Sequence, residues 1–499
     1  MIPVLTKEQA YKLDKDTIEN GRLSQEELMD NAGKAVAQSF CEKIDNPFNQ
    51  KVVVVCGKGN NGGDGVIVHS YLKHYGVSSE IVFTEEKYGH LKLLKKYKIS
   101  KNEYFIYNHK TKFDKYDWII DGIFGIGLTR ELDDKYRMII NKINNKKNII
   151  SIDVPSGIYD YLLVESASFI NSKYTITFGY PKLAHYMNPI NNIIVSDIGF
   201  KNLNKINIYK IIADDIKEIL IADELKSNKH KKHTECEIHA GSFKYPGAAF
   251  LCSMAAHKTG SGYVRLYYGN SENKSIEAEK NESPILNNMK ALMPEIIVES
   301  ADELDIAHEV LDDTPMLIGP GWITSSYLEI YSQIARHKRV VIDAAAIRCF
   351  DEYAVEDISD KFDIIPEYSI MTPHVGEFKS FFQLDEIHYT DIQKIQKIIG
   401  QKVVILKSFN TFIITKDMIY IMDQGPSNLA TAGTGDVLSG ILVSLLSQGY
   451  SRLEASILGT YLHAEAANYY MNNISKDGMT ASDLIDCIPH AFNSLRKND

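Results

Sequence analysis

The chain alternates between short β-branched runs and longer segments whose apolar residues recur at helical spacing. This alternation predicts a parallel sheet with helices on both faces, because parallel strands need long crossover connections. Upstream of the first strand, residues 7–40 have helical spacing, and Leu23 to Glu27 predicts a capped helix start. The strand-like runs of the first half are Val52 to Cys56, Glu80 to Phe83, Trp118 to Asp121 and Ile149 to Asp153.

The same alternation returns after residue 233 and predicts a second α/β layer domain. A chain of 499 residues also exceeds one ordinary core. Mixed charge between Ile208 and His233 is typical of a junction, so we place one domain at 1–215 and the other at 222–499. The later strand-like runs are Met316 to Ile318, Val340 to Asp343, Ser369 to Met371, Val403 to Leu406 and Thr411 to Thr415.

Composition narrows the functional classes. The formal net charge of -10 disfavours non-specific nucleic-acid binding, and the lysine-rich runs at 92–98 and 229–232 are interpreted as solvated faces or linkers. Six scattered cysteines without CxxC pairing favour reduced thiols. No stretch reaches membrane-span length, and the first ten residues lack an apolar signal region. We expect a cytoplasmic protein without nucleic-acid or membrane partners.

The first glycine loop predicts an anion site in the first domain. Gly57, Gly59, Gly62 and Gly63 lie within seven residues, so the backbone can approach a phosphate closely. The segment lacks both the ending of a nucleoside-triphosphate loop and the spacing of a dinucleotide fingerprint.

Two strand-ending acids, Asp121 and Asp153, are expected beside this loop, at the sheet edge where α/β proteins bind ligands. Considered alone, each acid is as well explained as a turn or helix cap.

The second glycine loop, Gly433-Thr434-Gly435-Asp436, opens a predicted helix from Val437 to Leu446. A helix N-terminus attracts an anion, and here a carboxylate lies beside it. His374, behind a Thr-Pro turn, is equally well explained as a helix cap. His463 and Glu465 are interpreted as structural residues of a helix.

The first half resembles the NAD(P)H-hydrate epimerases over nearly all of 1–215. The motifs that carry the resemblance are LMDNAG from Leu28, NNGGDG from Asn60, DGIFGIGL from Asp121, IDVPSG from Ile152 and TFGYPK from Thr177. The resemblance implies a Rossmann-like αβα sandwich and a potassium ion held by Asn61, Asp121 and Ser156. Ile126 stands where threonine is common. The implied substrate-binding residues are Asn60, Asn61, Gly62, Gly63, Asp64, Gly125, Ile126, Gly127, Leu128, Thr129, Arg130 and Glu131.

The chemistry of such a substrate favours a carboxylate. Its hydroxyl lies on a ring carbon next to nitrogen, so that carbon inverts if the hydroxyl leaves and water returns on the other face. A group that gives and takes a proton suffices. Asp153 matches a substrate-contacting acid of the family, and we assign it this catalytic role as a hypothesis.

The second half resembles the ADP-dependent (S)-NAD(P)H-hydrate dehydratases, which have a ribokinase-like αβα fold, across about 225–495. Besides the second glycine loop, the resemblance rests on AGS from Ala240, YPGAA from Tyr245, GSG from Gly260, GPG from Gly319, TPHVGEF from Thr372 and Leu406-Lys407. It implies hydrate contacts at Ala249, Gly321, His374 and Asp436, and adenine-nucleotide contacts at Lys407, Ser408, Phe409, Asn410, Thr411 and Gly435.

The implied reaction phosphorylates the ring hydroxyl with ADP as co-substrate, accompanied by Mg²⁺. The ring nitrogen then expels phosphate, and Asp436 serves as the base. Three residues depart from the family pattern: Ser408 and Lys232 replace glycines, and Ala345 replaces a frequent aspartate.

Together the two resemblances imply a bifunctional enzyme of nicotinamide-nucleotide repair. Its substrates would be NADHX, NADPHX and ADP, and we expect a homo-oligomer. In the first alternative, the N-terminal domain is a non-catalytic nucleotide-binding module. In the second, the C-terminal domain is a ribokinase-like, ATP-dependent small-molecule kinase that leaves phosphate on its product.

Overall fold

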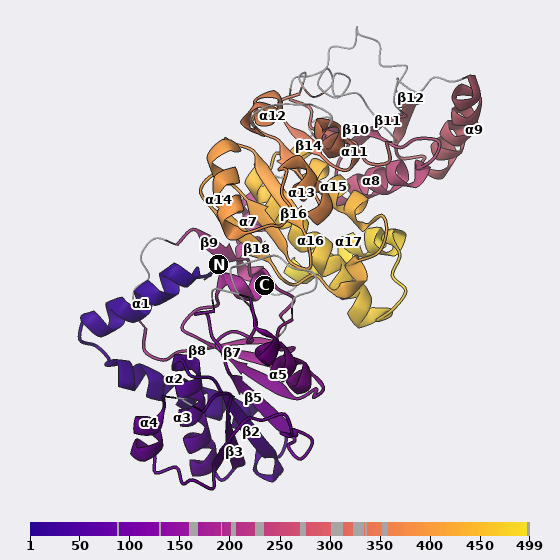
Figure 1. The fold of residues 1–499 in the computed structure, drawn as a ribbon. Coiled ribbons are helices and arrows are strands. Elements are labelled where there is room, and N and C mark those ends of the chain that lie inside the picture. Colours follow the sequence, from indigo (N-terminus) through magenta and orange to yellow (C-terminus); the bar gives the residue numbers. More distant parts are fainter. Residues whose placement is uncertain are drawn as a thin grey trace. The chain divides into compact units, whose positions relative to one another are not determined.

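The computed structural model comprises two compact units, Pro3–Ile208 and Tyr209–Asp499, the latter with Met1–Ile2 (Figure 1). The residues that the structure describes are 1–86, 89–128, 131–158, 168–190, 192–200, 206–224, 234–269, 276–300, 313–322, 334, 337–351 and 358–496.

The unit Pro3–Ile208 is built on a parallel sheet with strand order β4-β3-β2-β5-β6-β7-β8. The strands are β2 (Lys51–Cys56), β3 (Ser78–Phe83), β4 (Tyr104–Ile106), β5 (Trp118–Gly122), β6 (Ile149–Ile152), β7 (Tyr174–Phe178) and β8 (Ile193–Ser196). The helices are α1 (Lys7–Glu19), α2 (Gln25–Lys43), α3 (Asn60–His74), α4 (Leu91–Lys96), α5 (Asp134–Asn144) and α6 (Leu183–Tyr186). β1 (Ile2–Pro3) precedes them, and η1 (Pro47–Asn49) is a 3₁₀ turn.

Strand β2 shows why this sheet is covered on both faces. Val52, Val54 and Cys56 pack into the core that contains α2 and α3 residues, whereas Val53 and Val55 pack into the core that contains α5 residues. Successive strand side chains point to opposite faces, so an all-apolar strand fits only between two apolar layers. The three-layer αβα sandwich expected from the sequence is therefore confirmed for this unit.

The larger unit has a sheet whose order from β9 is β9-β18-β17-β16-β15-β14-β13-β10-β11-β12. Strands β10 to β16 pair in parallel, while β16, β17 and β18 are antiparallel. The strands are β9 (Ile208–Lys210), β10 (Glu235–Ala240), β11 (Tyr263–Tyr268), β12 (Ile297–Ser300), β13 (Met316–Ile318), β14 (Val340–Ile342), β15 (Ile370–Met371), β16 (Val403–Lys407), β17 (Thr411–Ile414) and β18 (Ile419–Met422).

Helix α15 (Thr434–Ser447) is the central helix of this unit. Every residue of it is buried except Gly435 and Asp436, so the helix offers its first turn alone to a ligand. Gly440 permits close packing on α8, since a Cβ there would lie 2.3 Å from the Cys252 carbonyl oxygen. The other helices are α7 (Ala213–Glu224), α8 (Pro246–Thr259), α9 (Ile276–Leu292), α11 (Ala345–Arg348), α12 (Ile358–Ile364), α13 (Val375–Phe381), α14 (Tyr389–Ile398), α16 (Arg452–Asn473) and α17 (Ala481–Arg496), with 3₁₀ turns η4 (Cys349–Asp351) and η5 (Ser427–Leu429).

The predicted junction is partly wrong. Ile208–Lys210 is strand β9 and Ala213–Glu224 is helix α7, and Ile211, Ile216 and Leu220 are buried in the core of the larger unit. The mixed charge belongs to an amphipathic helix, and the compact units divide after Ile208. Residues 225–233, including Lys232, lie outside the described residues.

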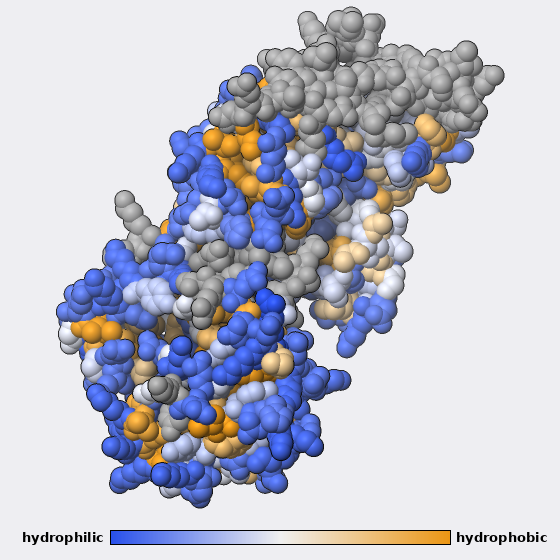
Figure 2. Space-filling view, in the orientation of Figure 1, coloured by the Kyte–Doolittle hydropathy of each residue, from blue (hydrophilic) through white to orange (hydrophobic). Residues whose placement is uncertain are grey.

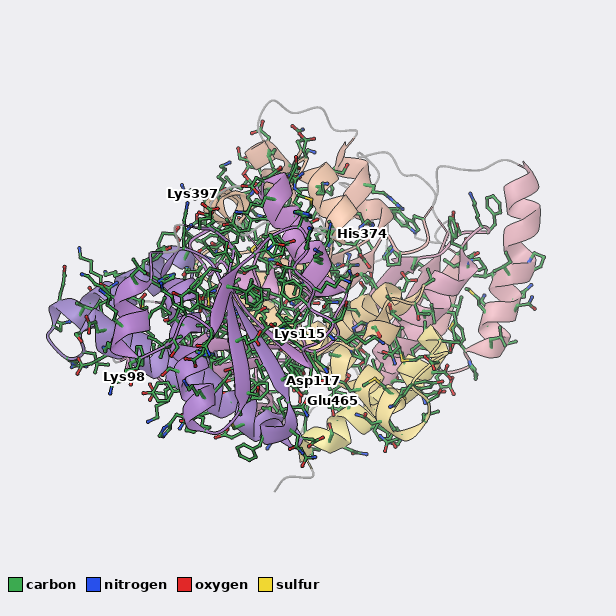
Figure 3. The ribbon with its side chains drawn as sticks, turned by 60° about the horizontal axis from the view of Figure 1, so that its bottom comes forward. Lys98, Lys115, Asp117, His374, Lys397 and Glu465 are labelled. Atoms are coloured by element: carbon green, nitrogen blue, oxygen red, sulfur yellow. The ribbon has the colours of Figure 1, made fainter. Side chains whose placement is uncertain are left out.

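Several local predictions are confirmed. Ser24 accepts a hydrogen bond from the Glu27 N–H, 3.2 Å away, and Glu27 accepts one from Ser24, forming a capping box. The lysine run of α4 is solvated around a buried Leu94, and Lys98 lies at the surface in Figure 3. All six cysteines have free thiols.

Hydrophilic groups cover most of the face shown in Figure 2, with apolar groups in small clusters. Among the described helices, none combines the length and the apolarity that crossing a membrane requires.

Candidate active sites

The first site lies where the strand order of the smaller sheet reverses. From β2 the chain continues outward to β3 and β4, whereas β5 to β8 extend the sheet on the other side. Crevices outside the carboxyl ends of strands at such reversals hold ligands in α/β proteins. The first glycine loop follows β2, and Asp121 lies in β5, so the sequence brings both motifs to this crevice.

The glycines of the first loop serve close backbone packing. A Cβ at Gly57 would lie 2.0 Å from the Ile123 carbonyl oxygen, and one at Gly62 would lie 1.9 Å from the Gly57 carbonyl oxygen. Helix α3 begins at Asn60, so the loop residues from Asn60 onward form the first helical turn. That turn presents amide N–H groups without helical partners.

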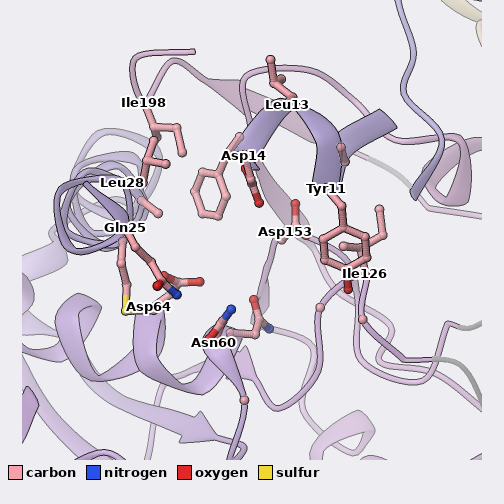
Figure 4. Close-up of a pocket in the computed structure, with 18 of the residues that line it drawn as sticks. Tyr11, Leu13, Asp14, Gln25, Leu28, Asn60, Asp64, Ile126, Asp153 and Ile198 are labelled. Carbon is pink, nitrogen blue, oxygen red and sulfur yellow. The ribbon is translucent and has the colours of Figure 1, made fainter. Parts of the chain in front are cut away.

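A cavity of about 760 Å³ opens above this edge (Figure 4). Eight of the predicted residues line it, together with apolar residues of α1 and α2 such as Leu13 and Leu28. Those eight are Asn60, Asn61, Asp64, Gly125, Ile126, Gly127, Leu128 and Asp153.

The remaining predicted residues of this site are placed differently. Gly62 and Gly63 are buried inside α3 and do not line the cavity. Glu131 is exposed and forms an ion pair with Arg137 at 3.0 Å. Thr129 and Arg130 lie outside the described residues.

Asp153 is held in one orientation at the cavity wall. Its carboxylate is 2.9 Å from the Lys182 Nζ and accepts a hydrogen bond from the Thr177 hydroxyl at 3.0 Å. The His185 ring contacts the Asp153 carbonyl oxygen at 2.7 Å. Burial alone would raise the pKa of Asp153, but the Lys182 charge and hydrogen bond outweigh burial and lower the pKa. Asp153 is therefore ionised, and it adopts φ 63°, which non-glycine residues rarely do.

Asn61, Asp121 and Ser156 form one oxygen-rich cluster. The Ser156 hydroxyl is 2.6 Å from Asp121 Oδ1 and 3.1 Å from the Phe124 carbonyl oxygen, to which the Asn61 amide also donates at 2.9 Å. Asp121 is fully buried and accepts further hydrogen bonds from the Ile123 and Ser156 N–H groups. Thus Asp121 stabilises the turn after β5, whereas the alternative interpretation expected it to cap a helix, and it does so within the cluster of residues that the family resemblance predicts.

Sequence reasoning missed Asp14, which lines the same cavity from α1. Desolvation in the cavity and the Asp153 charge raise the pKa of Asp14 to about 6, with Lys182 opposing them, although the residue itself is exposed. Asp64 has its pKa raised well above the usual range by burial and by the charges of Asp153 and Asp14. No local signal identified Asp14, because an exposed acid next to the buried Leu13 is ordinary on an amphipathic helix.

Ile126, which departs from the family pattern, has a packing role. Its side chain packs against the cluster of Leu5, Ala10 and Leu13 and also lines the cavity. A threonine there would offer a hydroxyl to a ligand, whereas the isoleucine extends the apolar contact with α1.

The second site is built around the start of α15. Gly433 caps the helix with φ 90°, a left-handed conformation that favours glycine, and Asp436 follows in the first turn. Burial and the nearby Asp343 charge raise the pKa of Asp436 to about 7, against an opposing effect of Lys407. A carboxyl group with this pKa accepts a proton readily near neutral pH.

Asp343 and Lys407 form an ion pair beside Asp436. Their Oδ1 and Nζ atoms are 2.9 Å apart, and the Ser439 hydroxyl donates to Asp343 Oδ2 at 2.7 Å. Burial would raise the pKa of Asp343, but Lys407 and the hydrogen bonds lower it. Sequence reasoning missed Asp343, although it ends a strand-like run as Asp121 and Asp153 do.

Lys407 also joins the other predicted nucleotide residues. A Cβ on Gly435 would make an ordinary contact with the Lys407 Nζ at 3.5 Å, which places Gly435 next to this lysine. Lys407 pairs with Thr411 across the β16–β17 hairpin, and the Ser408 hydroxyl closes the intervening loop by donating to the Asn410 carbonyl at 2.5 Å. Phe409 remains partly exposed in that loop.

His374 begins α13 as its N-cap and forms a backbone bridge with Lys407. Its Nδ1 accepts from the Gly376 N–H at 3.0 Å, while the side chain stays 58% exposed. The capping interpretation is therefore confirmed. His374 is labelled in Figure 3.

Ala249 and Gly321 meet at the reversal point of the larger sheet. Gly321 has φ 73°, and a Cβ on Gly321 would lie 3.1 Å from the Gly241 Cα. A Cβ on Gly241 would in turn lie 2.8 Å from the Ala249 Cβ. Ala249 is fully buried, so its side chain packs in the core.

His463 and Ala345 have structural places. The His463 Nε2 contacts the Thr434 carbonyl oxygen at 2.8 Å, which braces the start of α15. Ala345 begins α11 and is 5% exposed.

The fold and the two sites define a fused two-domain α/β enzyme in which each unit has a carboxylate beside a glycine-rich helix start. Residues 25–184 match the family of the YjeF-related protein N-terminus, and residues 237–490 match that of NAD(P)H-hydrate dehydratase. The chain also has a bifunctional relative that is 31% identical along 94% of each chain, and it therefore belongs to the family of bifunctional NAD(P)H-hydrate repair enzymes.

Relatives span both units. The bifunctional NAD(P)H-hydrate repair enzyme Nnr of Dictyoglomus turgidum is 31% identical over 503 residues, covering 94% of each chain. That of Thermofilum pendens is 28% identical over 528 residues, covering 97% of this chain and 95% of the other. A solved ADP/ATP-dependent NAD(P)H-hydrate dehydratase from Bacillus subtilis, co-crystallised with ATP/Mg²⁺, is 22% identical with a TM-score of 0.46, covering 58% of this chain and all of that one.

Proposed function

We propose that the smaller unit interconverts the R and S forms of NAD(P)H hydrate and that the larger unit dehydrates the S form, converting ADP to AMP and phosphate. The observation that carries this proposal is the pair of carboxylates, Asp153 and Asp436, each placed beside a glycine-rich helix start. Both units of the relatives are present in one chain, and a dehydratase specific for one epimer needs a partner activity for the other.

In the smaller unit, the ionised Asp153 suits the role of proton acceptor, and the cavity has room for a nicotinamide nucleotide. The amides at the start of α3 would face its phosphates. Asn60, Asn61, Asp64 and the turn from Gly125 to Leu128 would bind the remainder.

A potassium ion fits the cluster of Asn61, Asp121 and Ser156. The donors are oxygen atoms only, one of them a buried carboxylate, and hard cations prefer such ligands. When bound, the ion would supply positive charge beside the cavity and favour an anionic ligand there.

In the larger unit, Asp436 would take the proton of the ring hydroxyl as that oxygen attacks the terminal phosphorus of ADP. AMP leaves with the electron pair of the broken P–O bond. The ring nitrogen then expels phosphate, and the ring loses the proton that restores the dihydronicotinamide. Lys407, the hairpin loop Ser408 to Asn410, Thr411 and Gly435 would hold the nucleotide, with Mg²⁺ accompanying its phosphates.

The hydrate would contact Gly321, His374 and the backbone at Ala249. The cytoplasmic location and the homo-oligomeric state stay predictions.

One assay tests these assignments. The full chain is incubated with mixed R and S hydrates, ADP and Mg²⁺ in potassium buffer, and reduced-nicotinamide absorbance and AMP are followed. We expect complete recovery of absorbance. Recovery that halts after the S form would mean that the smaller unit is a non-catalytic module. A phosphorylated product that persists, with ATP as donor, would identify the larger unit as a kinase and overturn the dehydratase assignment.

A further inference from the structure

The cavity of the smaller unit contains a second carboxylate that the proposed mechanism does not yet use. Asp14 projects from α1, and Asp153 follows β6, so two separate elements carry carboxyl groups into one cavity (Figure 4). Within the described residues, Asp14 has no hydrogen-bond or ion-pair partner, whereas Asp153 is bound by Lys182 and Thr177.

The two carboxyl groups therefore differ in pKa. Lys182 keeps Asp153 ionised, while desolvation in the cavity and the charge of Asp153 raise the pKa of Asp14 to about 6, so a fraction of Asp14 stays protonated near neutral pH. Two carboxyl groups in one site whose environments separate their pKa values can divide the acid and base roles. The charged and titratable groups that line the cavity around them are Tyr11, Lys15, Glu19, Lys58, Asp64 and Lys182.

Inversion at a hydroxyl-bearing carbon needs two proton transfers. The departing hydroxyl must gain a proton on one face of the ring, and the entering water must lose one on the opposite face. A single carboxylate would have to serve both faces in turn.

We propose that Asp14 is a second catalytic residue of the epimerase, which donates a proton to the departing ring hydroxyl while Asp153 accepts a proton from the entering water. This inference rests on the epimerase function proposed above. The assignment uses the carboxyl group of higher pKa as the proton donor and the ionised one as the acceptor, each delivered by its own element.

The step balances as follows. The Asp14 carboxyl gives its proton to the hydroxyl oxygen, the C–O bond breaks with its electron pair on the leaving water, and the nitrogen lone pair forms a C=N bond. Water adds to the other face, the C=N electrons return to nitrogen, and Asp153 takes the released proton. One proton has moved from Asp14 to Asp153, and transfer through water in the cavity returns it.

The test measures exchange between purified R and S hydrates by the full-length protein, with the uncatalysed exchange subtracted at each pH. We expect Asp14→Asn to slow enzymatic exchange at least about 100-fold. The matched control is Asp16→Asn, because Asp16 lies on the same helix outside the cavity lining. We expect the control to stay within about threefold of the wild type, as expected for a surface substitution.

Two further readouts separate catalysis from structure. The affinity for NADPH, used as an unreactive probe, should change less than about threefold in Asp14→Asn if Asp14 acts on the proton rather than on binding. The wild-type rate should fall above about pH 6 as Asp14 loses its proton. Asp14→Asn should lack this fall, and Asp14→Glu should restore part of it.

The outcomes distinguish two failures. If the wild type exchanges the epimers and Asp14→Asn retains its rate within about threefold, the role of Asp14 is refuted while the epimerase function stands. A wild-type rate that rises through pH 6 would also refute proton donation. If the wild type itself shows no exchange, the epimerase function fails and the role of Asp14 fails with it.

Discussion

Each of the two sites has a lysine near the carboxyl group proposed for catalysis, but the lysine pairs with that group in one site only. In the smaller unit, Lys182 pairs directly with the carboxylate proposed for catalysis, Asp153, and lowers its pKa. In the larger unit, the available cation, Lys407, pairs with Asp343, and the proposed base Asp436 has its pKa raised to about 7.

The difference shows how a neighbouring ion pair sets the protonation state of a carboxyl group. A cation bound to the functional carboxylate fixes the ionised state. A cation bound to a different carboxylate leaves a second negative charge nearby, which favours the protonated state. Asp153 is thus ionised before it accepts a proton, whereas Asp436 itself titrates near neutral pH.

The largest expected effect comes from Asp436→Asn. We expect dehydration to fall at least about 100-fold to 10,000-fold, because the amide cannot take the hydroxyl proton. Epimer exchange should remain within about twofold of the wild type. AMP release and epimer separation measure the two activities in one sample. A folded variant that loses both activities would contradict the division of roles between the units.

Lys182→Met tests the clamped carboxylate. Removing the cation leaves Asp153 partly buried without its partner, which should cost roughly 3–5 kcal/mol of unfolding free energy. The pKa of Asp153 should also rise. A carboxyl group whose pKa is lower in the folded than in the unfolded protein stabilises the folded state at pH values above its unfolded pKa. This stabilisation is lost on acidification, so the cost of Lys182→Met should shrink as the pH falls below about 4.

Denaturant unfolding at pH 7 and at about pH 3 measures this change. Lys12→Met, on the exposed face of α1, is the control. An equal loss at both pH values would show that the lysine acts through packing alone.

Asp343→Asn tests the unclamped carboxylate. Loss of the Asp343 charge removes a cause of the raised pKa of Asp436, and Lys407 is no longer neutralised. Both changes lower the pKa of Asp436. The rise of the dehydration rate with pH, expected near pH 7 in the wild type, should move to lower pH. The pH dependence of kcat/KM measures the shift, and an unchanged profile would show that Asp343 does not influence the base.

Gly433→Ala gives the smallest expected effect. Both Gly433 and Gly478 have positive φ, but a Cβ at Gly433 would lie 2.6 Å from Leu251 Cδ1, whereas one at Gly478 meets nothing within 4 Å. Gly478→Ala should therefore cost about 1–2 kcal/mol from backbone strain alone. Gly433→Ala should cost more and slow dehydration, because it displaces the turn that holds Asp436. Thermal unfolding of both variants measures the two costs. Equal shifts of the unfolding temperature in Gly433→Ala and Gly478→Ala would show that the contact with Leu251 contributes nothing.

The sequence predicts the layers of both units well because strand and helix periodicities are local signals. The strands at β2, β5, β6 and β14 match the β-branched runs, and Ser24 caps α2. The junction was mistaken because mixed charge describes the solvent face of α7 as well as a linker.

Partners distant in sequence could not be predicted in the same way. Asp343 and Lys407 are 64 residues apart, and Asp14 meets the Asp153 cavity only after α1 packs over the sheet edge. Periodicity does not specify such pairs. The strand-end rule would have selected Asp343, whereas no local pattern distinguishes the exposed Asp14.

The left-handed backbone at Asp153 limits which side chains can ever replace it. At φ 63°, β-branched residues are strongly strained, whereas asparagine and glycine are tolerated. Asn is therefore the one substitution that removes the charge while preserving shape and chain path. Few other residues are therefore compatible with this position. A related protein that has lost the epimerase activity is expected to have Asn or Gly here.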